Sequence, residues 1–367
     1  MADESESQIP DTRVLAVASH VVSGNVGNKI AVFSMQSLGC EVAALNTVQF
    51  SNHTGYRQWT GSKVSAEEIT DLWQGLKQSY LDHFDMMLSG YIPGAAAVEA
   101  VGQIAEELQT RAASRPGSFF WVLDPVMGDN GKLYVAADVV PAYKKILAHA
   151  DLILPNQFEA EVLSDVKIHD MASLTQAIQA LHERYGVPHV VITSVSFTSD
   201  PAAAAPRTLS VVGSTMTSGR RARLFQIAFP RINAYFSGTG DMFAALMVVR
   251  MREAVWRATA GSRQQPLAEV ASWVSGDEVE ARGLPLARAC EKVLGSMHGV
   301  LDETCRAMNR DVARARQGLD AGAGVGTSEE EDRKRLHLLQ SQAAELRLVR
   351  HLDILRNPKV DYSAQQM

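Results

Sequence analysis

The chain has 367 residues, of which 46% are hydrophobic and 21% charged, as in an ordinary globular protein. Its 41 acidic and 35 basic residues leave a net charge of -6, so no basic excess points to nucleic acid or an anionic membrane as a partner. Three scattered cysteines, a polar start and the lack of any long apolar run argue against a secreted or membrane-spanning protein. We therefore expect a soluble cytoplasmic protein, with the nucleus also compatible.

Short apolar runs alternate with helical patterns through the first half of the chain. Buried strands are predicted at residues 13–19, 41–48, 85–89, 119–123, 151–154 and 189–193. Helices are predicted between them at residues 27–38, 67–80, 95–113, 156–163 and 172–185. This alternation predicts a three-layer α/β/α fold whose central sheet is mostly parallel and is covered by helices on both faces.

The pattern changes in the second half of the chain. Two antiparallel strands are predicted at residues 208–212 and 224–229, and helical stretches at 284–308 and 336–355. Residues 255–281 are predicted to be an inserted surface loop with some helix, and the glycine-rich residues 318–328 a flexible linker. We expect one domain over residues 13–355, preceded by a disordered tail at 1–12 and followed by a C-terminal tail at 356–367.

The segment SGTGD places the carboxylate of Asp241 at the start of an apolar helix, after two glycines. A helix N-terminus offers free N–H groups, and glycines let the backbone approach a phosphate closely. A carboxylate there can accept the proton of a hydroxyl that attacks a γ-phosphate. The same pattern is also that of an Asp that caps a helix after a glycine-rich turn. It is not the Walker pattern, because no Lys-Ser/Thr follows.

Acidic and amide side chains follow two predicted strands at their carboxyl ends, where open α/β sheets bind ligands. The segment DPVMGD supplies Asp124 and Asp129, which suit Mg-ATP or, alternatively, a turn that Asp129 caps. The segment PNQFEAE supplies Asn156 and Glu159, whose spacing is also that of a helix capping box. The sequence leaves both readings open for each pair.

Hydroxyl and aromatic side chains gather after three other strands. Thr193-Ser194 ends one strand, and its hydroxyls suit phosphate or an ion. Ser19 ends the first strand before a glycine-containing loop that lacks the dinucleotide-binding spacing. The segment VQFSNHTGY offers a cluster suited to a small planar ring, or simply core and loop residues: Val48, Phe50, His53, Thr54 and Tyr56.

In chain order, the segments SHVVSGNVGNK, NTVQFSNHTGY, LSGY, DPVMGD, PNQFEAE, VVITS and SGTGDMFAAL resemble the pyridoxal kinases of the ribokinase-like superfamily. The resemblance spans about residues 13–250 and resumes in ARACEKVLGSMHGVL and AAELRLVRHLDILRNPKV. The blocks SNHTGY and PNQFEAE favour this branch over sugar kinases. The resemblance implies ATP-dependent phosphorylation of the 5′-hydroxymethyl group of pyridoxal, pyridoxine and pyridoxamine, without ranking the three vitamers.

The resemblance also implies a role for each matching residue. Asp241 would be the general base. The B6 ring would be held by Ser19, Val48, Phe50, Thr54 and Tyr91, with Asp241 at the reacting hydroxyl. ATP would be bound by Asp124, Tyr134, Asn156, Thr193, Ser194, Gly238, Thr239 and Gly240. Asp129 and Glu159 would serve Mg²⁺, a monovalent cation (K⁺ or Na⁺) would assist, and the protein would be a homodimer with a complete site in each subunit.

The chain departs from the family pattern in two places. The family often has Thr where this chain has Leu154, which puts side-chain coordination of the monovalent cation in doubt. The segment at 255–281 has no counterpart that we can place.

Two other functions remain compatible with the residues. One is a kinase for another hydroxymethyl heterocycle, such as hydroxymethylpyrimidine, because it would use the same base and anion-binding turn. The other is a non-catalytic regulator that binds a B6 vitamer, although a binding module would need no base at Asp241.

Overall fold

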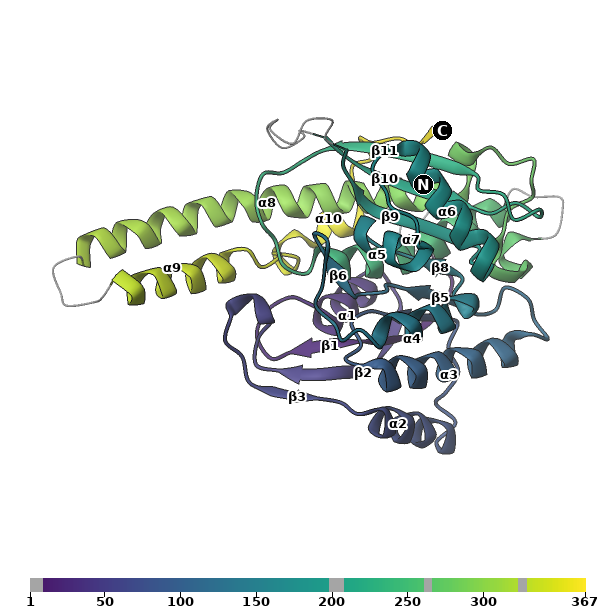
Figure 1. Cartoon of the computed structure of the whole chain (residues 1–367), viewed down its shortest axis with the longest axis horizontal. Coiled ribbons are helices and arrows are strands. Elements are labelled where there is room, and N and C mark those ends of the chain that lie inside the picture. Colours follow the sequence, from purple (N-terminus) through teal and green to yellow (C-terminus); the bar gives the residue numbers. More distant parts are fainter. Residues whose placement is uncertain (1–8, 198–207, 261–265, 323–328) are drawn as a thin grey trace, which may run out of the picture.

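The computed structural model describes residues 9–197, 208–260, 266–322 and 329–367 (Figure 1). Its centre is a ten-stranded sheet in the order β12-β11-β10-β9-β8-β5-β4-β1-β2-β3. Six neighbouring strands are parallel: β9 (His189–Val195), β8 (Leu152–Ile153), β5 (Phe120–Leu123), β4 (Met86–Ser89), β1 (Arg13–Val21) and β2 (Glu41–Phe50). Antiparallel strands extend both edges: β3 (Gly61–Lys63), β10 (Thr208–Thr215), β11 (Leu224–Pro230) and β12 (Gln365–Gln366). The predicted mostly parallel sheet is confirmed.

Helices cover both faces of this sheet, as predicted. One face carries α1 (Asn28–Ser37), α7 (Thr239–Ala260), α8 (Pro285–Gly322) and α10 (Leu352–Arg356). The other carries α2 (Ala66–Gln78), α3 (Ala95–Ala112), α4 (Val139–Ile146), α5 (Gln157–Ser164) and α6 (Met171–Tyr185). The remaining helix, α9 (Glu329–Ala343), runs beside the outer part of α8, and the pair projects from the body of the protein (Figure 1). None of the described helices is long and apolar enough to cross a membrane.

Side chains of the central strands alternate between two hydrophobic cores, one on each face. In β1, Val14 and Ala16 pack on the side of α1 and α7, whereas Leu15 and Val17 pack on the side of α2 and α3. All four are at most 1% exposed. A strand that is buried on both faces has a continuous run of apolar residues, and such a run is easily recognised in the sequence.

The short elements lie mostly in loops. A small hairpin is formed by β6 (Gly128–Asp129) and β7 (Lys132–Leu133). The single-turn 3₁₀ helices are η1 (Thr54–Tyr56), η2 (Leu147–His149), η3 (Leu267–Glu269), η4 (Ala271–Trp273), η5 (Ala281–Gly283) and η6 (Val349–His351).

Both ends of the described chain pack more closely than predicted. Ile9 and Thr12 are 4% and 2% exposed, so the packed domain begins before the predicted boundary at residue 13; residues 1–8 lie outside the described part. At the other end, β12 pairs with β11, and the N–H of Ala364 donates to Glu291 at 2.8 Å. The segment predicted as a C-terminal tail therefore extends the sheet, because β11 offers it an unpaired edge.

The segment predicted as a surface insertion is only partly at the surface. Helix α7 continues to Ala260, and residues 261–265 lie outside the described part. Trp273 is 0% exposed, and its ring stacks on Phe120 at a centroid distance of 4.2 Å. Its indole N–H donates to the carbonyl of Gly117 at 2.9 Å. The prediction of a surface loop is therefore wrong for this part of the segment, because one aromatic side chain enters the core.

The two predictions for the C-terminal third also need correction. Helix α8 runs through Gly322, so the first residues of the predicted linker at 318–328 are helical, while residues 323–328 lie outside the described part. Extending an existing helix is less costly than starting one, which lets it continue into glycine-rich sequence. The predicted helical stretch at 336–355 is divided, because α9 ends at Ala343 and α10 begins at Leu352.

Candidate active site

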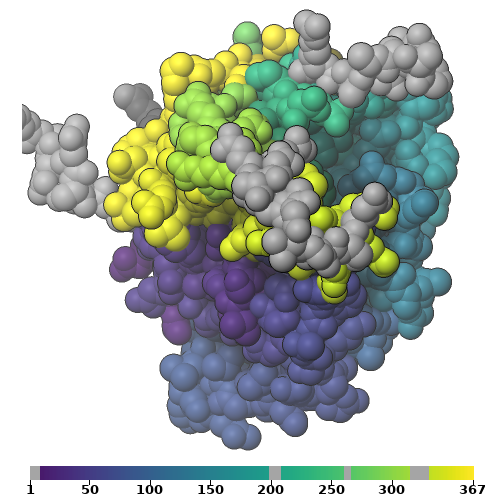
Figure 2. Space-filling view, turned by 90° about the vertical axis from the view of Figure 1, so that its left-hand side faces the viewer, coloured from purple at the N-terminus to yellow at the C-terminus, as the bar shows by residue number. Residues whose placement is uncertain are grey.

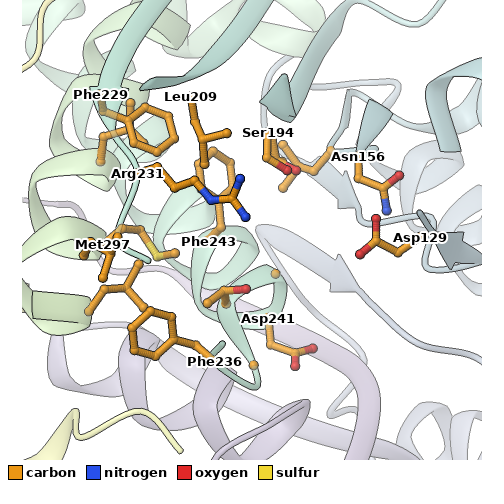
Figure 3. A pocket seen from close by; sticks show the side chains of 18 of the residues that line it. Asp129, Asn156, Ser194, Leu209, Phe229, Arg231, Phe236, Asp241, Phe243 and Met297 are labelled. Atoms are coloured by element: carbon orange, nitrogen blue, oxygen red, sulfur yellow. The ribbon is translucent and has the colours of Figure 1, made fainter. Parts of the chain in front are cut away.

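A cavity of about 500 Å³ opens at the carboxyl ends of β5, β8 and β9, beside the start of α7 (Figure 3). The structure brings to this cavity every residue predicted for the nucleotide, the metal and the base. They are Asp124, Asp129, Tyr134, Asn156, Glu159, Thr193, Ser194, Gly238, Thr239, Gly240 and Asp241. These residues are far apart in the chain and meet because parallel strands all end at the same edge of the sheet. Their individual roles remain predictions.

Asp241 lies in the first turn of α7, with its side chain directed towards the cavity. The N–H of Gly27, from the loop between β1 and α1, donates a hydrogen bond to its carboxylate. Burial raises the pKa of Asp241, and this hydrogen bond opposes the rise. A buried carboxylate with a raised pKa is well matched to accept a proton near neutral pH.

The turn before Asp241 requires glycine at Gly238. Its φ is +82°, and a Cβ atom there would lie 2.3 Å from the carbonyl oxygen of Asn25. Gly240 is less crowded, because a Cβ atom there would lie 3.8 Å from Asp124 Oδ2. The turn is therefore packed against the β1–α1 loop on one side and faces Asp124 on the other.

Three carboxylates share this end of the sheet. The pKa of Asp124 is raised well above its usual value by burial and by the nearby charges of Glu159 and Asp241. Burial also raises the pKa of Glu159 to about 7, although three backbone N–H groups lower it. A carboxylate whose pKa is raised by neighbouring carboxylates, as that of Asp124 is, lies in a site that favours protons or cations.

Asn156 and Glu159 hold the DPVMGD loop against α5. They form the capping box that their spacing suggested, and the Asn156 amide also donates to the Gly128 carbonyl at 2.8 Å. Glu159 Oε1 accepts the N–H groups of Met127 at 2.8 Å and Gly128 at 3.3 Å, and Oε2 accepts that of Asn156 at 3.0 Å. Both oxygens of Glu159 thus accept backbone N–H groups, and two of these hydrogen bonds tie the loop that carries Asp124 and Asp129 to α5.

The β6–β7 hairpin forms one wall of the cavity. Asp129 is exposed, and its carboxylate accepts hydrogen bonds from the backbone and side-chain amides of Asn130 at 2.7 and 2.9 Å. Tyr134 follows the hairpin, is 59% exposed and lines the cavity. The position of Tyr134 is compatible with the predicted contact to ATP.

The residues predicted to hold the B6 ring lie outside the lining of this cavity, around the carboxyl ends of β1, β2 and β4. Ser19 is next to Gly27, since a Cβ atom on Gly27 would lie 2.3 Å from Ser19 Oγ. The Thr47 hydroxyl donates to the Tyr91 carbonyl at 2.7 Å, which joins β2 to the segment after β4. Val48 is buried, Phe50 is half-buried and Thr54 is exposed. Because Gly27 also binds Asp241, the structure places Ser19 near the predicted base.

Several residues that line the cavity were not identified from the sequence. They come from β10, β11, the loop after β11, α7 and α8: Leu209, Phe229, Arg231, Phe236, Phe243, Leu294, Met297, His298 and Leu301. The guanidinium of Arg231 points into the cavity towards Ser194 (Figure 3). No local pattern marks these residues, because each lies in an element whose own sequence shows only strand, loop or helix.

Two buried polar atoms near the site have no hydrogen-bond partner in the described structure. They are His53 Nε2, in the SNHTGY segment, and Ser237 Oγ, directly before the glycine turn. Buried polar groups are almost always hydrogen-bonded in folded proteins, so these two atoms are available to a ligand or a water molecule.

The carboxylates around the cavity fit Mg²⁺ only as an ion that shares its ligands with phosphates. Among the described residues, no three His, Cys, Asp or Glu side chains are placed to hold a metal by themselves. Mg²⁺ bound with a nucleotide usually takes one or two carboxylates together with phosphate oxygens and water. Asp124 and Asp129 face the cavity and can supply that number.

Leu154 stands where the family often has a Thr that could bind the monovalent cation. It is 3% exposed and also lines the cavity. Its side chain belongs to the hydrophobic core on the α7 side of the sheet. Its side chain thus contributes packing at a position where a hydroxyl could have bound an ion.

Comparisons with a family model, with curated relatives and with solved structures all find similarity to small-molecule kinases. A family model described as phosphomethylpyrimidine kinase matches residues 82–259. Sheep pyridoxal kinase is 36% identical over 307 residues, which cover 81% of this chain and 86% of the relative, and human pyridoxal kinase is 34% identical with coverages of 80% and 86%. The structure resembles that of Leishmania donovani pyridoxal kinase in complex with ADP and pyridoxamine, with a TM-score of 0.73, 30% identity and coverages of 97% and 100%.

Proposed function

The chain belongs to the pyridoxal kinase family and uses ATP to phosphorylate the 5′-hydroxymethyl group of B6 vitamers, and we propose that Asp241 is the base for this transfer. The observation that carries the proposal is the position of Asp241. It lies between the glycine turn at one end of the nucleotide cavity and the strand ends that carry Ser19 and Tyr91.

In the proposed reaction, Asp241 accepts the proton of the vitamer's hydroxyl as its oxygen attacks the γ-phosphorus. The new O–P bond forms while the bond between the γ-phosphorus and the β–γ bridging oxygen breaks, and ADP leaves. The backbone N–H groups of the turn at Gly238–Asp241 stabilise negative charge at the start of α7. Arg231, which points into the cavity, is placed to add a further positive charge near the phosphates.

We assign Mg²⁺ to the side of the cavity formed by Asp124 and Asp129, where it would neutralise phosphate charge when bound with ATP. Glu159 acts mainly by fixing their loop through its three backbone hydrogen bonds. The Thr193 and Ser194 hydroxyls serve the phosphates or a monovalent cation. At Leu154 only the backbone carbonyl is available to such an ion.

The family-model match, described as phosphomethylpyrimidine kinase, supports a substituted pyrimidine as a second candidate class of substrate, and hydroxymethylpyrimidine is the one with a free hydroxymethyl group. That reaction would use the same base and glycine turn, so the site geometry does not favour it over a B6 vitamer. The names of the sheep, human and Leishmania relatives, together with pyridoxamine in the Leishmania complex, support the B6 vitamers.

Two further assignments rest on the family and on composition. We propose that the protein acts in the cytoplasm or nucleus, which fits its three free cysteines, two of them buried. We also propose a homodimer with a complete site in each subunit, which a molar-mass measurement in solution would test.

The direct test is incubation of the purified protein with Mg-ATP and, separately, pyridoxal, pyridoxine, pyridoxamine and hydroxymethylpyrimidine. We expect 5′-phosphates of the B6 vitamers, at a rate that exceeds that of hydroxymethylpyrimidine. Asp241→Asn serves as the control for contaminating kinases. Phosphorylation of hydroxymethylpyrimidine alone would overturn the B6 assignment, and no product from any of the four would overturn the kinase assignment.

A further inference from the structure

A short segment after α9 connects three loops of the site, although two of its contacts join residues that are 289 and 321 positions apart in the chain. We call residues 344–346 the strap. The N–H of Ser237 donates to the Ala344 carbonyl at 3.3 Å, and the Asn25 side chain donates to the Leu346 carbonyl at 2.8 Å. The strap therefore joins the turn before Asp241 to the β1–α1 loop. Figure 2 shows C-terminal residues, in yellow, lying directly on N-terminal residues, in purple and blue.

The central residue of the strap, Glu345, reaches a third loop, the SNHTGY segment at residues 51–56. Its Oε1 accepts the hydroxyl of Tyr56 at 2.6 Å and lies 3.9 Å from His53 Nε2. It also packs against Gly24, where a Cβ atom would lie 2.9 Å from Oε1. The Glu345 side chain is only 15% exposed, so its contacts are largely shielded from water. Hydrogen bonds to a shielded carboxylate are among the stronger ones in proteins.

His53 is oriented by the same cluster. Its Nδ1 accepts the N–H of Gly55 at 3.2 Å, so a neutral ring carries its proton on Nε2, the atom that faces Glu345. Burial lowers the pKa of His53, whereas Glu345 raises it. A second contact, from His337 on α9 to the Gly55 carbonyl at 3.0 Å, holds the same loop next to Tyr56.

We propose that Glu345 is a positioning residue for the B6 vitamer. By holding Tyr56 and facing His53, it sets the loop that presents Thr54, while the strap holds the β1–α1 loop and the turn that carry Gly27 and Asp241. This inference rests on the proposed function, because it concerns the vitamer side of that site. Tyr56, His53 and Glu345 lie outside the lining of the nucleotide cavity, so their effect falls on the vitamer and not on ATP.

The test is the steady-state kinetics of Glu345→Ala, Glu345→Gln and Tyr56→Phe with pyridoxal and ATP varied in turn. Loss of a hydrogen bond to a charged partner predicts a rise of about 10-fold or more in KM for pyridoxal with Glu345→Ala. We expect KM for ATP to change less than about 2-fold. Glu345→Gln retains an acceptor for Tyr56 and should recover part of the loss. Glu330→Ala, an exposed acid on α9, is the matched control and should behave as the parent.

A double variant tests whether Tyr56 and Glu345 act together or whether each substitution impairs the protein independently. If Tyr56 acts through Glu345, the combination of Glu345→Ala and Tyr56→Phe should be no worse than Glu345→Ala alone. Additive losses, an equal rise in both KM values, or an unchanged KM for pyridoxal would each overturn the proposal. If Glu345→Ala does not fold, Tyr56→Phe and Glu345→Gln decide the question by the same KM comparison. Failure of the parent to phosphorylate any vitamer would instead overturn the proposed function.

Discussion

Both ends of the central sheet contain buried carboxylates, but the two ends differ in the hydrogen bonds and the neighbouring charges of these groups. At the carboxyl end, Asp124, Glu159 and Asp241 lie close together, and the pKa of each is raised. At the amino end, Asp151 is also buried, with a pKa raised by burial to about 6. Its carboxylate, however, accepts the N–H of Trp121 at 2.7 Å and a hydrogen bond from the Ser272 side chain.

The polar side-chain atoms of His189 and Trp273, near Asp151, also have hydrogen-bond partners. His189 uses both ring nitrogens, with Thr215 Oγ1 at 2.8 Å and the Ser272 carbonyl at 2.7 Å. The Trp273 indole binds the Gly117 carbonyl. At the carboxyl end, His53 Nε2 and Ser237 Oγ have no partner. Neither burial nor a missing hydrogen bond distinguishes a binding site from a structural cluster, since Arg252 Nε beside Trp273 also lacks a partner among the described residues. The carboxyl end differs because several buried carboxylates lie close together, and the charges of Glu159 and Asp241 raise the pKa of Asp124.

The largest expected effect is loss of turnover at the carboxyl end. Asp241→Asn should lower kcat by at least about 10²-fold, the usual scale for loss of a general base. Its melting temperature should stay the same or rise, because the change removes a buried charge that has no salt-bridge partner in the described structure. The control is Asp151→Asn, which should retain the kcat of the parent. Equal losses of turnover in the two variants would contradict the distinction between the ends.

For Trp273→Ala at the amino end we expect a loss of stability without a loss of turnover. Removing this fully buried ring should lower the free energy of unfolding by about 3–5 kcal/mol, as measured by denaturant titration. The kcat of the protein that remains folded should be unchanged, because Trp273 is far from the carboxyl ends of the strands. Trp256→Ala, which removes a ring that is 48% exposed, should cost much less. A stability loss equal in both variants would show that the inserted segment is not part of the core.

A smaller effect is expected in the pH dependence of stability. Because the pKa of Glu159 is raised to about 7, the folded protein binds more protons than the unfolded chain between the usual value of 4.5 and about 7. Its contribution to stability is therefore lost as pH rises through this window. The melting temperature of Glu159→Gln should fall less between pH 5 and 7 than that of the parent. The same change at exposed Glu106 should leave the parent's slope, and parallel curves for all three proteins would refute the shift.

The smallest expected effect concerns the monovalent cation. Leu154→Thr should lower the K⁺ concentration for half-activation, because a hydroxyl adds an oxygen ligand at a position where the side chain now provides only packing. Turnover is measured against K⁺ concentration at constant ionic strength. Leu154→Val is the control, since valine has nearly the shape of threonine without the hydroxyl. Superimposable curves for the three proteins would show that this position does not affect cation binding.

The sequence predicted the carboxyl edge of the sheet better than the segments that enclose it. The strands before Asp124, Asn156 and Thr193 and the glycine turn before Asp241 were all located, because apolar runs and turn residues are local signals. The capping box of Asn156 and Glu159 was likewise visible in their spacing. The roles predicted for these residues in binding ATP, Mg²⁺ and the vitamer remain to be tested.

The predictions that failed concern segments whose place is set by distant partners. The C-terminal residues Gln365–Gln366 form a strand because β11 has an open edge. Trp273 lies in the core because its ring stacks on Phe120 and its indole N–H binds the Gly117 carbonyl. Neither segment has a strong pattern of its own.

The sequence by itself determined the six parallel strands, most of the helices on the two faces of the sheet and the carboxylate at the start of α7, since each depends on residues within a few positions of one another. Only the tertiary structure decided that Arg231 lines the cavity at the carboxyl ends of the strands and that Glu345 meets Tyr56, His53 and the turn before Asp241. The physical reason is that a contact between residues nearly 300 positions apart, such as Tyr56 and Glu345, is made by the packing of whole elements. Such a contact cannot be inferred from the residues that surround Tyr56 or Glu345 in the sequence.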